Sequence, residues 1–320
     1  MIRSWLCAAL PFILLVPGAT ACAEQVAPEP PKVTDALPPI TFPTSAAHDA
    51  PSALGRRYQV WVDLPPSYAR SKKSLPVVFV LDPHWALPVT RSVRSLVGQR
   101  GRNIEDFILV GLSHDQDRGL EGQRRDYTPT DPRRDPAHSP GSYSAPSYGE
   151  AEAYRQYIET VVFPLVARNY RVDMNRKILV GHSYGTLFGF HVLFTRPEMF
   201  NGYVFGSPSL WFDLGVMFRT EEAWARSGRK LSARIHMVTG SFEAIAPGAR
   251  YNTTNDLVAD MERTRRTLAS RGHPGLLITS EIAQGEDHLT VFPDVVTRGL
   301  LAVLPGHGPY TGRVVSVNVV

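Results

Sequence analysis

The sequence predicts an α/β fold, a three-layer α/β/α sandwich around a mostly parallel central sheet. Apolar runs typical of strands alternate along the chain with segments of helical spacing, as in folds with helices on both faces of a sheet. The runs at 75–83 and 107–115 are apolar on both sides, as expected for strands buried on two faces. The 320 residues, 43% hydrophobic and 20% charged, suffice for one large folded domain.

The expected strands are short apolar runs. The first alternates in polarity and stops at the Pro65-Pro66 pair, which is typical of a strand followed by a turn. The later runs are continuous and apolar, and several end in Gly, Ser or an acidic residue. We expect strands at 58–62, 75–83, 107–115, 176–180, 202–209, 234–243 and 276–288.

The expected helices carry apolar residues three and four positions apart. The longest begins near Glu150 and Glu152, whose negative charges suit a helix N-terminus. Another is amphipathic and stops at Gly272. We expect helices at 147–170, 186–197, 255–272 and 292–304.

The chain divides into a leader, a linker, a catalytic domain and a tail. The linker is rich in Pro, Ala, Thr and Ser, and one interpretation has it end in an edge strand. An aperiodic stretch of the domain, rich in Pro, Gly, Ser and Arg, is expected to be a functional loop or cap. The expected parts are a signal peptide at 1–23, a linker at 24–54, a domain at 55–305 with the cap at 117–149, and a tail at 306–320.

The leader predicts export. Arg3 precedes an apolar run too short to span a bilayer, and a small-residue cleavage signal ends at Ala23. We therefore expect a periplasmic or secreted protein; an uncleaved anchor and lipoprotein processing at Cys22 are the alternatives. The other cysteine, Cys7, also lies in the leader, so the mature chain would have no disulfide and no thiol nucleophile.

The charge pattern argues against a nucleic-acid partner. The formal charge is +4 and the isoelectric point about 9.1, but Lys and Arg are scattered among acidic residues without a basic stripe. Outside the leader, no apolar stretch approaches the length of a membrane span. We therefore expect a small-molecule substrate; the sequence does not indicate an oligomeric state.

Residues 181–185 read Gly-His-Ser-Tyr-Gly, with a strand expected before them and a helix after them. This context is typical of a nucleophile elbow, whose sharp turn lifts a serine hydroxyl clear of the sheet. Gly181 and Gly185 would avoid clashes with the neighbouring helix and strand. We therefore expect Ser183 to be a nucleophile; the alternative is a serine in a structural turn.

A serine nucleophile requires a base and an acid that orients it. His288 lies in a loop between the last strand and the last helix, where the base falls in the order Ser, acid, His. Glu243 closes the strand before it and is the expected acid. The alternatives are a surface histidine at 288 and, for the acid, one of four other carboxylates: Asp256, Asp260, Glu286 and Asp287.

An oxyanion hole requires two backbone N–H donors. The N–H of Tyr184, directly after the nucleophile, is one expected donor. The loop after the 75–83 strand should supply the second, and because Pro83 has no N–H, we expect that of His84.

These motifs together resemble the esterase-D-type branch of the α/β-hydrolases, in particular the periplasmic siderophore (enterobactin-type trilactone) esterases. The resemblance covers roughly 56–304 and rests on the block 179–213, the "RRDYTPT" segment at 124–130 and "GEDHLTVFP" at 285–293. It implies Ser183 as nucleophile and His288 as base. Some such enzymes work with a Ser–His dyad, so the role of an acid stays open.

The resemblance also implies substrate contacts. The segment at 124–130 would border the cleft, where Arg124, Arg125 and Tyr127 would grip an anionic, aromatic substrate such as a ferric catecholate. The alternative is an arginine pair that anchors a loop. Trp211 is expected in the pocket wall, or alternatively in the core. The family's Asp-Gly after the second strand is Asp82-Pro83 here, which leaves the second oxyanion donor open.

The expected function is therefore that of a serine carboxylic-ester hydrolase acting through an acyl-enzyme, on siderophore-type polyesters. A broad carboxylesterase, thioesterase or acyltransferase of small acyl groups is the first alternative, and a ligand-binding relative without activity is the second. The reaction implies no metal or organic cofactor, since bound iron would belong to the substrate. Basic groups converging on the cleft would favour a polyanion, and an apolar tunnel would favour acyl chains.

Overall fold

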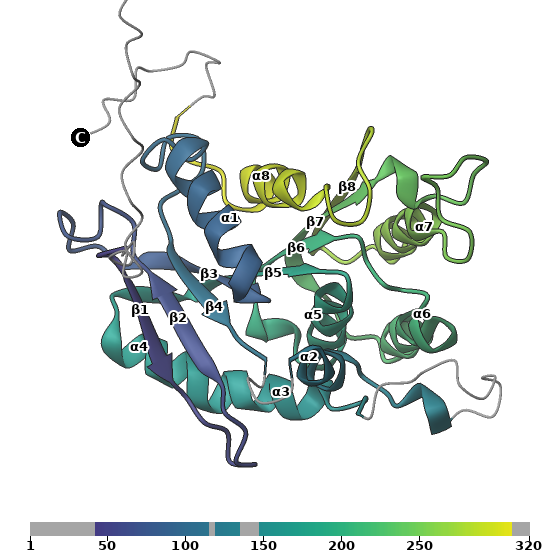
Figure 1. The fold of residues 1–320 in the computed structure, drawn as a ribbon, viewed down its shortest axis with the longest axis horizontal. Coiled ribbons are helices and arrows are strands. Elements are labelled where there is room, and N and C mark those ends of the chain that lie inside the picture. Colours follow the sequence, from purple (N-terminus) through teal and green to yellow (C-terminus); the bar gives the residue numbers. More distant parts are fainter. Residues whose placement is uncertain (1–41, 115–118, 135–146, 309–320) are drawn as a thin grey trace, which may run out of the picture. The chain divides into compact units, whose positions relative to one another are not determined.

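A computed structural model describes residues 42–114, 119–134 and 147–308 of the chain. The strands are β1 (Ser45–Asp49), β2 (Gln59–Asp63), β3 (Leu75–Leu81), β4 (Ile108–Leu112), β5 (Val172–His182), β6 (Gly202–Gly206), β7 (Ser232–Gly240) and β8 (Gly275–Ala283). They form one sheet in the order β1-β2-β4-β3-β5-β6-β7-β8 (Figure 1). The β1–β2 and β2–β4 pairs are antiparallel and the other pairs are parallel, which confirms the predicted mostly parallel sheet.

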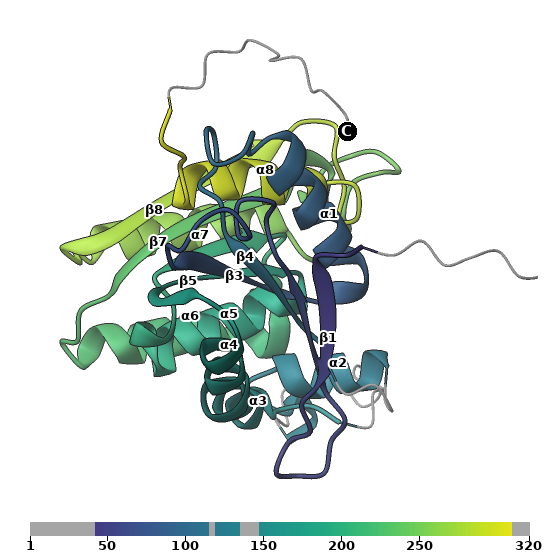
Figure 2. The ribbon, with the colours of Figure 1, turned by 90° about the vertical axis from the view of Figure 1, so that its left-hand side faces the viewer.

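Helices cover both faces of this sheet (Figure 2). Side chains alternate along β5: Ile178 and Val180 pack with α1 and α8 on one face, and Leu179 packs with α3, α5 and α6 on the other. The three-layer α/β/α prediction is therefore confirmed. The helices are α1 (Pro83–Leu96), α2 (Leu120–Tyr127), α3 (Ala151–Tyr157), α4 (Phe163–Asn169), α5 (Tyr184–Thr195), α6 (Phe212–Arg226), α7 (Leu257–Ser270) and α8 (Phe292–Val303).

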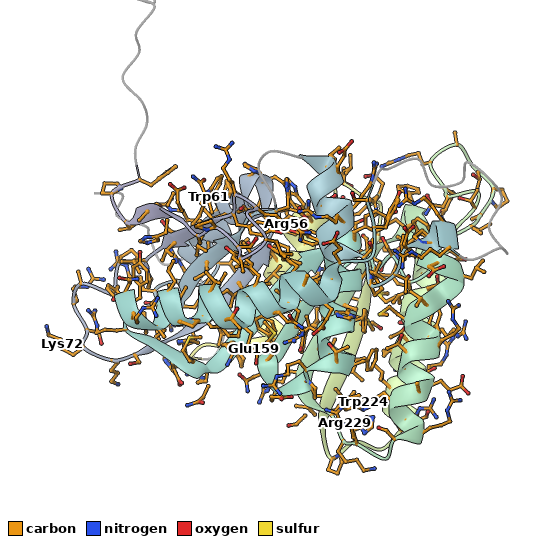
Figure 3. The ribbon with its side chains drawn as sticks, turned by 90° about the horizontal axis from the view of Figure 1, so that it is seen from below. Arg56, Trp61, Lys72, Glu159, Trp224 and Arg229 are labelled. Carbon is orange, nitrogen blue, oxygen red and sulfur yellow. The ribbon has the colours of Figure 1, made fainter. Side chains whose placement is uncertain are left out.

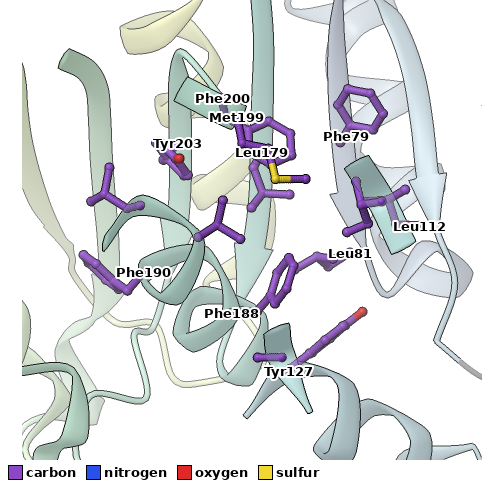
Figure 4. Packing of buried hydrophobic residues seen from close by; sticks show 14 of the residues in the cluster. Phe79, Leu81, Leu112, Tyr127, Leu179, Phe188, Phe190, Met199, Phe200 and Tyr203 are labelled. Atoms are coloured by element: carbon purple, nitrogen blue, oxygen red, sulfur yellow. The ribbon is translucent and has the colours of Figure 1, made fainter. Parts of the chain in front are cut away.

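Helix α5 is the buried centre of the second face. It is apolar all round, and 10 of its 12 residues are buried. Phe188 and Phe190 lie among the aromatic and aliphatic side chains of the core between the sheet and helices α3, α5 and α6 (Figure 4). Each buried side chain of this size contributes roughly 1.5–3 kcal/mol to folding. The N-terminus of α5, which follows Ser183 directly, is thus held by a rigid core.

The long helix expected at 147–170 is interrupted. It consists of α3, a π-helical turn (Ile158–Val162) and α4. Pro164 lies at the start of α4 and has no N–H to donate to the preceding turn, so the wider turn accommodates it.

Three helices have no counterpart among the expected elements. Helix α1 contains Pro83 and Pro88, which resemble turn residues in sequence, and α6 begins with left-handed residues at 213–215. Helix α2 lies within the segment 117–149, which the sequence predicts to be an irregular loop. A short 3₁₀ turn (Pro132–Arg134) also lies there, so part of the expected cap is ordered helix.

The domain begins earlier than expected. Strand β1 lies inside the predicted linker 24–54 and pairs with β2 over five residues, from Ser45–Asp63 to Asp49–Gln59. The expected edge strand therefore belongs to the sheet. The predicted signal peptide at 1–23, its cleavage at Ala23 and lipidation at Cys22 lie outside the described residues, as does the tail beyond residue 308. Among the described helices, none combines the length and apolar character that a membrane crossing needs.

The far end of α6 is closed by a surface contact. The Arg229 guanidinium carbon lies 3.9 Å from the centroid of the Trp224 ring (Figure 3). This cation–π contact packs over a tryptophan that is only 5% exposed, between the end of α6 and the start of β7.

Candidate active site

Ser183 lies in the turn between β5 and α5, at the carboxyl ends of the parallel strands. Its φ of 54° and ψ of −119° are unusual for a residue with a side chain. Such strain is found where the surrounding structure holds a residue in place, as in nucleophile elbows. The Ser183 N–H donates to Gly206 O in the neighbouring strand at 2.9 Å.

The two glycines of the motif have the steric role expected from the sequence. A Cβ at Gly181 would lie 2.7 Å from the carbonyl carbon and oxygen of Gly185, where the helix begins. A Cβ at Gly185 would lie 3.2 Å from Leu81 Cδ1 in β3. The close packing at Gly181 therefore excludes a side chain, and at Gly185 a side chain would require Leu81 to shift by a few tenths of an ångström.

Glu243 and His288 lie in direct contact. Glu243 follows β7 in a 3₁₀ turn (Ser241–Glu243), and its Oε2 lies 2.7 Å from His288 Nδ1. The side chain of Glu243 is 2% exposed and that of His288 is 40% exposed. The four alternative carboxylates have other surroundings; for example, Asp256 caps α7 by accepting from Ala259 N–H at 2.8 Å.

Three donors hold the Glu243 carboxylate. Its Oε1 accepts from Ser207 Oγ at 2.6 Å and from Gly240 N–H at 2.9 Å, and its Oε2 faces the His288 ring. Burial acts to raise the pKa of Glu243, but the hydrogen bonds from His288 and Ser207 outweigh it, so the pKa lies below its usual value. The carboxylate of Glu243 is therefore ionised beside the His288 ring.

Ser183 and His288 line one cavity. Its volume is about 180 Å³, and the other lining residues are Ser209, Trp211, Asn252, Thr254, Asn255 and Leu257. Ser183 Oγ lies 3.3 Å from Ser209 Oγ. In enzymes without substrate the contact between nucleophile and base is often long and shortens in the complex. Asn252, Thr254 and Asn255 are not among the site residues expected from the sequence, because they lie in a loop without a motif.

The two expected oxyanion donors lie at the first turns of two helices. Tyr184 begins α5, and His84 is the second residue of α1. The first N–H groups of a helix have no intrahelical acceptor and point outward from its end. The start of α1 lies beside the elbow. Asp82, the residue directly before α1, has its Oδ2 only 3.9 Å from the position that a Cβ at Gly185 would take.

His182 packs beside the elbow. Its Nε2–H donates to the carbonyl oxygen of His288 at 2.7 Å, and the two rings lie 4.8 Å apart. Burial lowers the pKa of His182 to about 4, so its ring is neutral near pH 7. His182 thereby holds the loop that carries His288.

Two predicted substrate contacts are wrong. Tyr127 is fully buried against Phe188 (Figure 4) and also contacts Tyr154. Its hydroxyl accepts from Asp82 N–H at 3.3 Å. Arg125 is 7% exposed, and its Nε donates to the buried Asp126 at 2.8 Å. The sequence placed these side chains on an open loop, whereas helix α2 turns them into the core.

Of the other two predicted substrate contacts, Trp211 lines the cavity and Arg124 does not. Trp211 lines the cavity beside Ser183, with its ring 6.2 Å from that of Tyr184. Arg124 is half-buried on α2, and the lining of that cavity does not include it.

A larger cavity, of about 580 Å³, lies at the amino ends of β6, β7 and β8, away from Ser183. Within the described ranges, no three His, Cys, Asp or Glu side chains gather closely enough to hold a metal.

The fold and this geometry define an ester hydrolase of the α/β-hydrolase type. Comparison with protein families agrees, because residues 51–264 match the family described as "Putative esterase". The match covers more than half of the chain, so the chain belongs to this family of esterases.

Individual relatives extend the likeness over most of the chain. Ferri-bacillibactin esterase BesA of Bacillus subtilis is 25% identical over 260 residues, 80% of this chain and 87% of that protein. The siderophore triacetylfusarinine C esterase of Aspergillus fumigatus is 26% identical over 290 residues, 82% and 94% of the two chains. The crystal structure of the BES protein from Bacillus cereus superposes with a TM-score of 0.70 at 24% identity, covering 83% of this chain and 98% of that one.

Proposed function

We propose that this esterase acts through Ser183, His288 and Glu243. His288 Nε2 takes the hydroxyl proton of Ser183 as Oγ attacks the ester carbonyl. The imidazolium is stabilised by the buried Glu243 carboxylate at 2.7 Å, which is the observation that carries the proposal. The alcohol leaves with the proton from His288, and water then hydrolyses the acyl-enzyme in the same way.

The tetrahedral intermediate carries a negative oxygen that requires donors. We assign this role to the N–H groups of Tyr184 and His84, at the starts of α5 and α1. The positive ends of both helices would add to the stabilisation. Removing one such donor typically costs about 3 kcal/mol of transition-state stabilisation.

The proposed substrate is an ester bond of a siderophore or similar polyester. Two relatives that align over about four-fifths of this chain are named as siderophore esterases, one for ferri-bacillibactin and one for triacetylfusarinine C. The iron would be part of the substrate. Arg124, half-buried on α2, stays a proposed contact for an anionic group.

A second candidate is a broad carboxylesterase, thioesterase or acyltransferase of small acyl groups. It is favoured by the cavity itself, which holds about 180 Å³ and whose described lining contains no Asp, Glu, Lys or Arg. Such a lining is neither a cluster of basic groups nor an apolar tunnel. It suits a small ester with hydrogen-bonding groups beside the scissile bond.

One experiment separates the two candidates. The protein and its Ser183→Ala variant are offered a ferric catecholate trilactone, a ferric hydroxamate ester and p-nitrophenyl acetate in parallel. Higher kcat/KM for a siderophore ester supports the first candidate, and activity on the acetate alone supports the second. Hydrolysis that persists in Ser183→Ala would refute the mechanism.

We further propose that the protein is exported. Support comes from Arg3, the short apolar run and the cleavage signal at Ala23. N-terminal sequencing of the protein from a periplasmic fraction should begin at Glu24. An intact N-terminus in the cytoplasm would contradict export, and a lipid-modified Cys22 would favour the lipoprotein alternative.

A further inference from the structure

Ser207 has an unusual conformation at the end of β6. Its φ of +47° is in the left-handed region, which costs a residue with a Cβ roughly 1 kcal/mol or more. The residue is fully buried, and its N–H donates to Val238 O in β7 at 2.9 Å. A serine kept in a conformation that favours glycine, without contact with solvent, indicates that its hydroxyl has a use.

That hydroxyl binds the acid of the site. Ser207 Oγ lies 2.6 Å from Glu243 Oε1. An ionised carboxylate only accepts hydrogen bonds, so Ser207 is the donor. Because Ser207 and Gly240 N–H both occupy Oε1, the carboxylate is oriented with Oε2 toward His288 Nδ1.

The same turn also reaches the nucleophile. Two residues after Ser207, the Oγ of Ser209 lies 3.3 Å from that of Ser183. Pro208 stands between them and restricts the backbone, and Leu210 N–H donates to its carbonyl at 2.8 Å. One short, rigid turn therefore contacts both the acid and the nucleophile.

We infer that Ser207 is a positioning residue of this esterase, which holds the Glu243 carboxylate in the orientation that supports His288. The inference rests on the proposed triad. Ser207 does not line the cavity beside Ser183, so it acts through Glu243 and not on the substrate. The left-handed conformation is the cost of bringing its hydroxyl to Oε1.

The test compares Ser207→Ala with Ser207→Gly, using p-nitrophenyl acetate hydrolysis. Both variants lose the hydroxyl, but glycine also relieves the backbone strain. We expect kcat to fall about 10- to 100-fold in both, with KM within about twofold of the parent, since a hydrogen bond to a charged group is lost. Ser207→Gly should melt at the same temperature as Ser207→Ala or higher.

A double-mutant cycle shows whether Ser207 acts through Glu243. In the Glu243→Gln background, Ser207→Ala should change kcat by less than about twofold, because the carboxylate it orients is gone. The matched control is Ser241→Ala in the same acid-bearing turn, whose Oγ instead accepts from Gly285 N–H at 3.0 Å. It should leave kcat unchanged.

Three outcomes would overturn the inference: full kcat in a folded Ser207→Gly, a rise in KM alone, or the same loss with and without Glu243. Its failure is distinct from failure of the proposed function. If only the inference about Ser207 fails, the parent enzyme keeps its Ser183-dependent activity. If the proposed function fails, Ser183→Ala hydrolyses the ester as fast as the parent.

Discussion

Asp82 is a buried acid whose hydrogen-bond partners are neutral groups. It lies between β3 and α1, is 3% exposed and has a φ of 51°. Its Oδ1 accepts from Gln123 Nε2 at 2.8 Å. Burial raises the pKa of Asp82 from 3.8 to about 7, with the Gln123 and Tyr127 hydrogen bonds opposing the shift. Replacing Asp82 with Asn removes the titration and suits the backbone, because Asn tolerates positive φ.

The sign of the effect follows from proton linkage. The folded protein holds the Asp82 proton more tightly than the unfolded chain, so this contribution to stability is full below pH 3.8 and is lost as the pH rises through about 7. Between pH 5 and 9 the loss spans about 2 pH units, or about 3 kcal/mol at 1.36 kcal/mol per unit. The positive end of α1 favours the ionised form and reduces this figure somewhat.

We therefore expect Asp82→Asn to gain stability relative to the parent as the pH rises. Its Tm, measured by calorimetry, should exceed the parent's by about 5 °C more at pH 9 than at pH 5. The control is Asp131→Asn at the surface, where a hydrogen bond from Arg133 lowers the pKa of the carboxyl. It should show no alkaline gain. A Tm difference for Asp82→Asn that is equal at both pH values would refute the reasoning.

Three further predictions concern the site. Glu243→Gln should lower kcat about 10³- to 10⁴-fold with KM little changed, because the imidazolium loses its carboxylate; a loss below tenfold would indicate a Ser–His dyad. Gly240→Ala would place a Cβ 2.4 Å from Glu286 O, and the shift of about 1 Å it forces near His288 should cost about 10²-fold in kcat. Gly228→Ala, with open space around it, is its control and should lower Tm alone. Tyr127→Phe should leave KM for a siderophore ester unchanged, since the ring is buried; a severalfold rise would restore Tyr127 to the substrate site.

Local patterns in the sequence were enough for the fold class and the elbow. Continuous apolar runs identify buried parallel strands because both faces of such strands are covered. The glycines around Ser183 identify the elbow because the packing of strand, turn and helix excludes a Cβ at Gly181 and leaves little room for one at Gly185. The order of residues along the chain predicted Glu243 and His288 as acid and base, and in the structure Glu243 Oε2 lies 2.7 Å from His288 Nδ1.

The burial of α2 depended on tertiary structure. Its polar sequence resembles a surface loop, but Arg125 and Asp126 neutralise each other inside the protein and Tyr127 packs against α5. Polar residues usually predict a surface position, but this prediction fails when their hydrogen-bond partners are buried with them.

The sequence by itself determined the strand–turn–helix units and the residues at their ends, because these depend on neighbours a few positions apart. Tertiary structure alone decided the sheet order, the presence of Asn252, Thr254 and Asn255 in the cavity lining, and the contact of Ser207 with Glu243, 36 residues away. Such contacts join segments that meet only when parallel strands assemble side by side. The register of the parallel strands places the carboxyl ends of β5, β6 and β7 side by side. No local sequence pattern encodes this register.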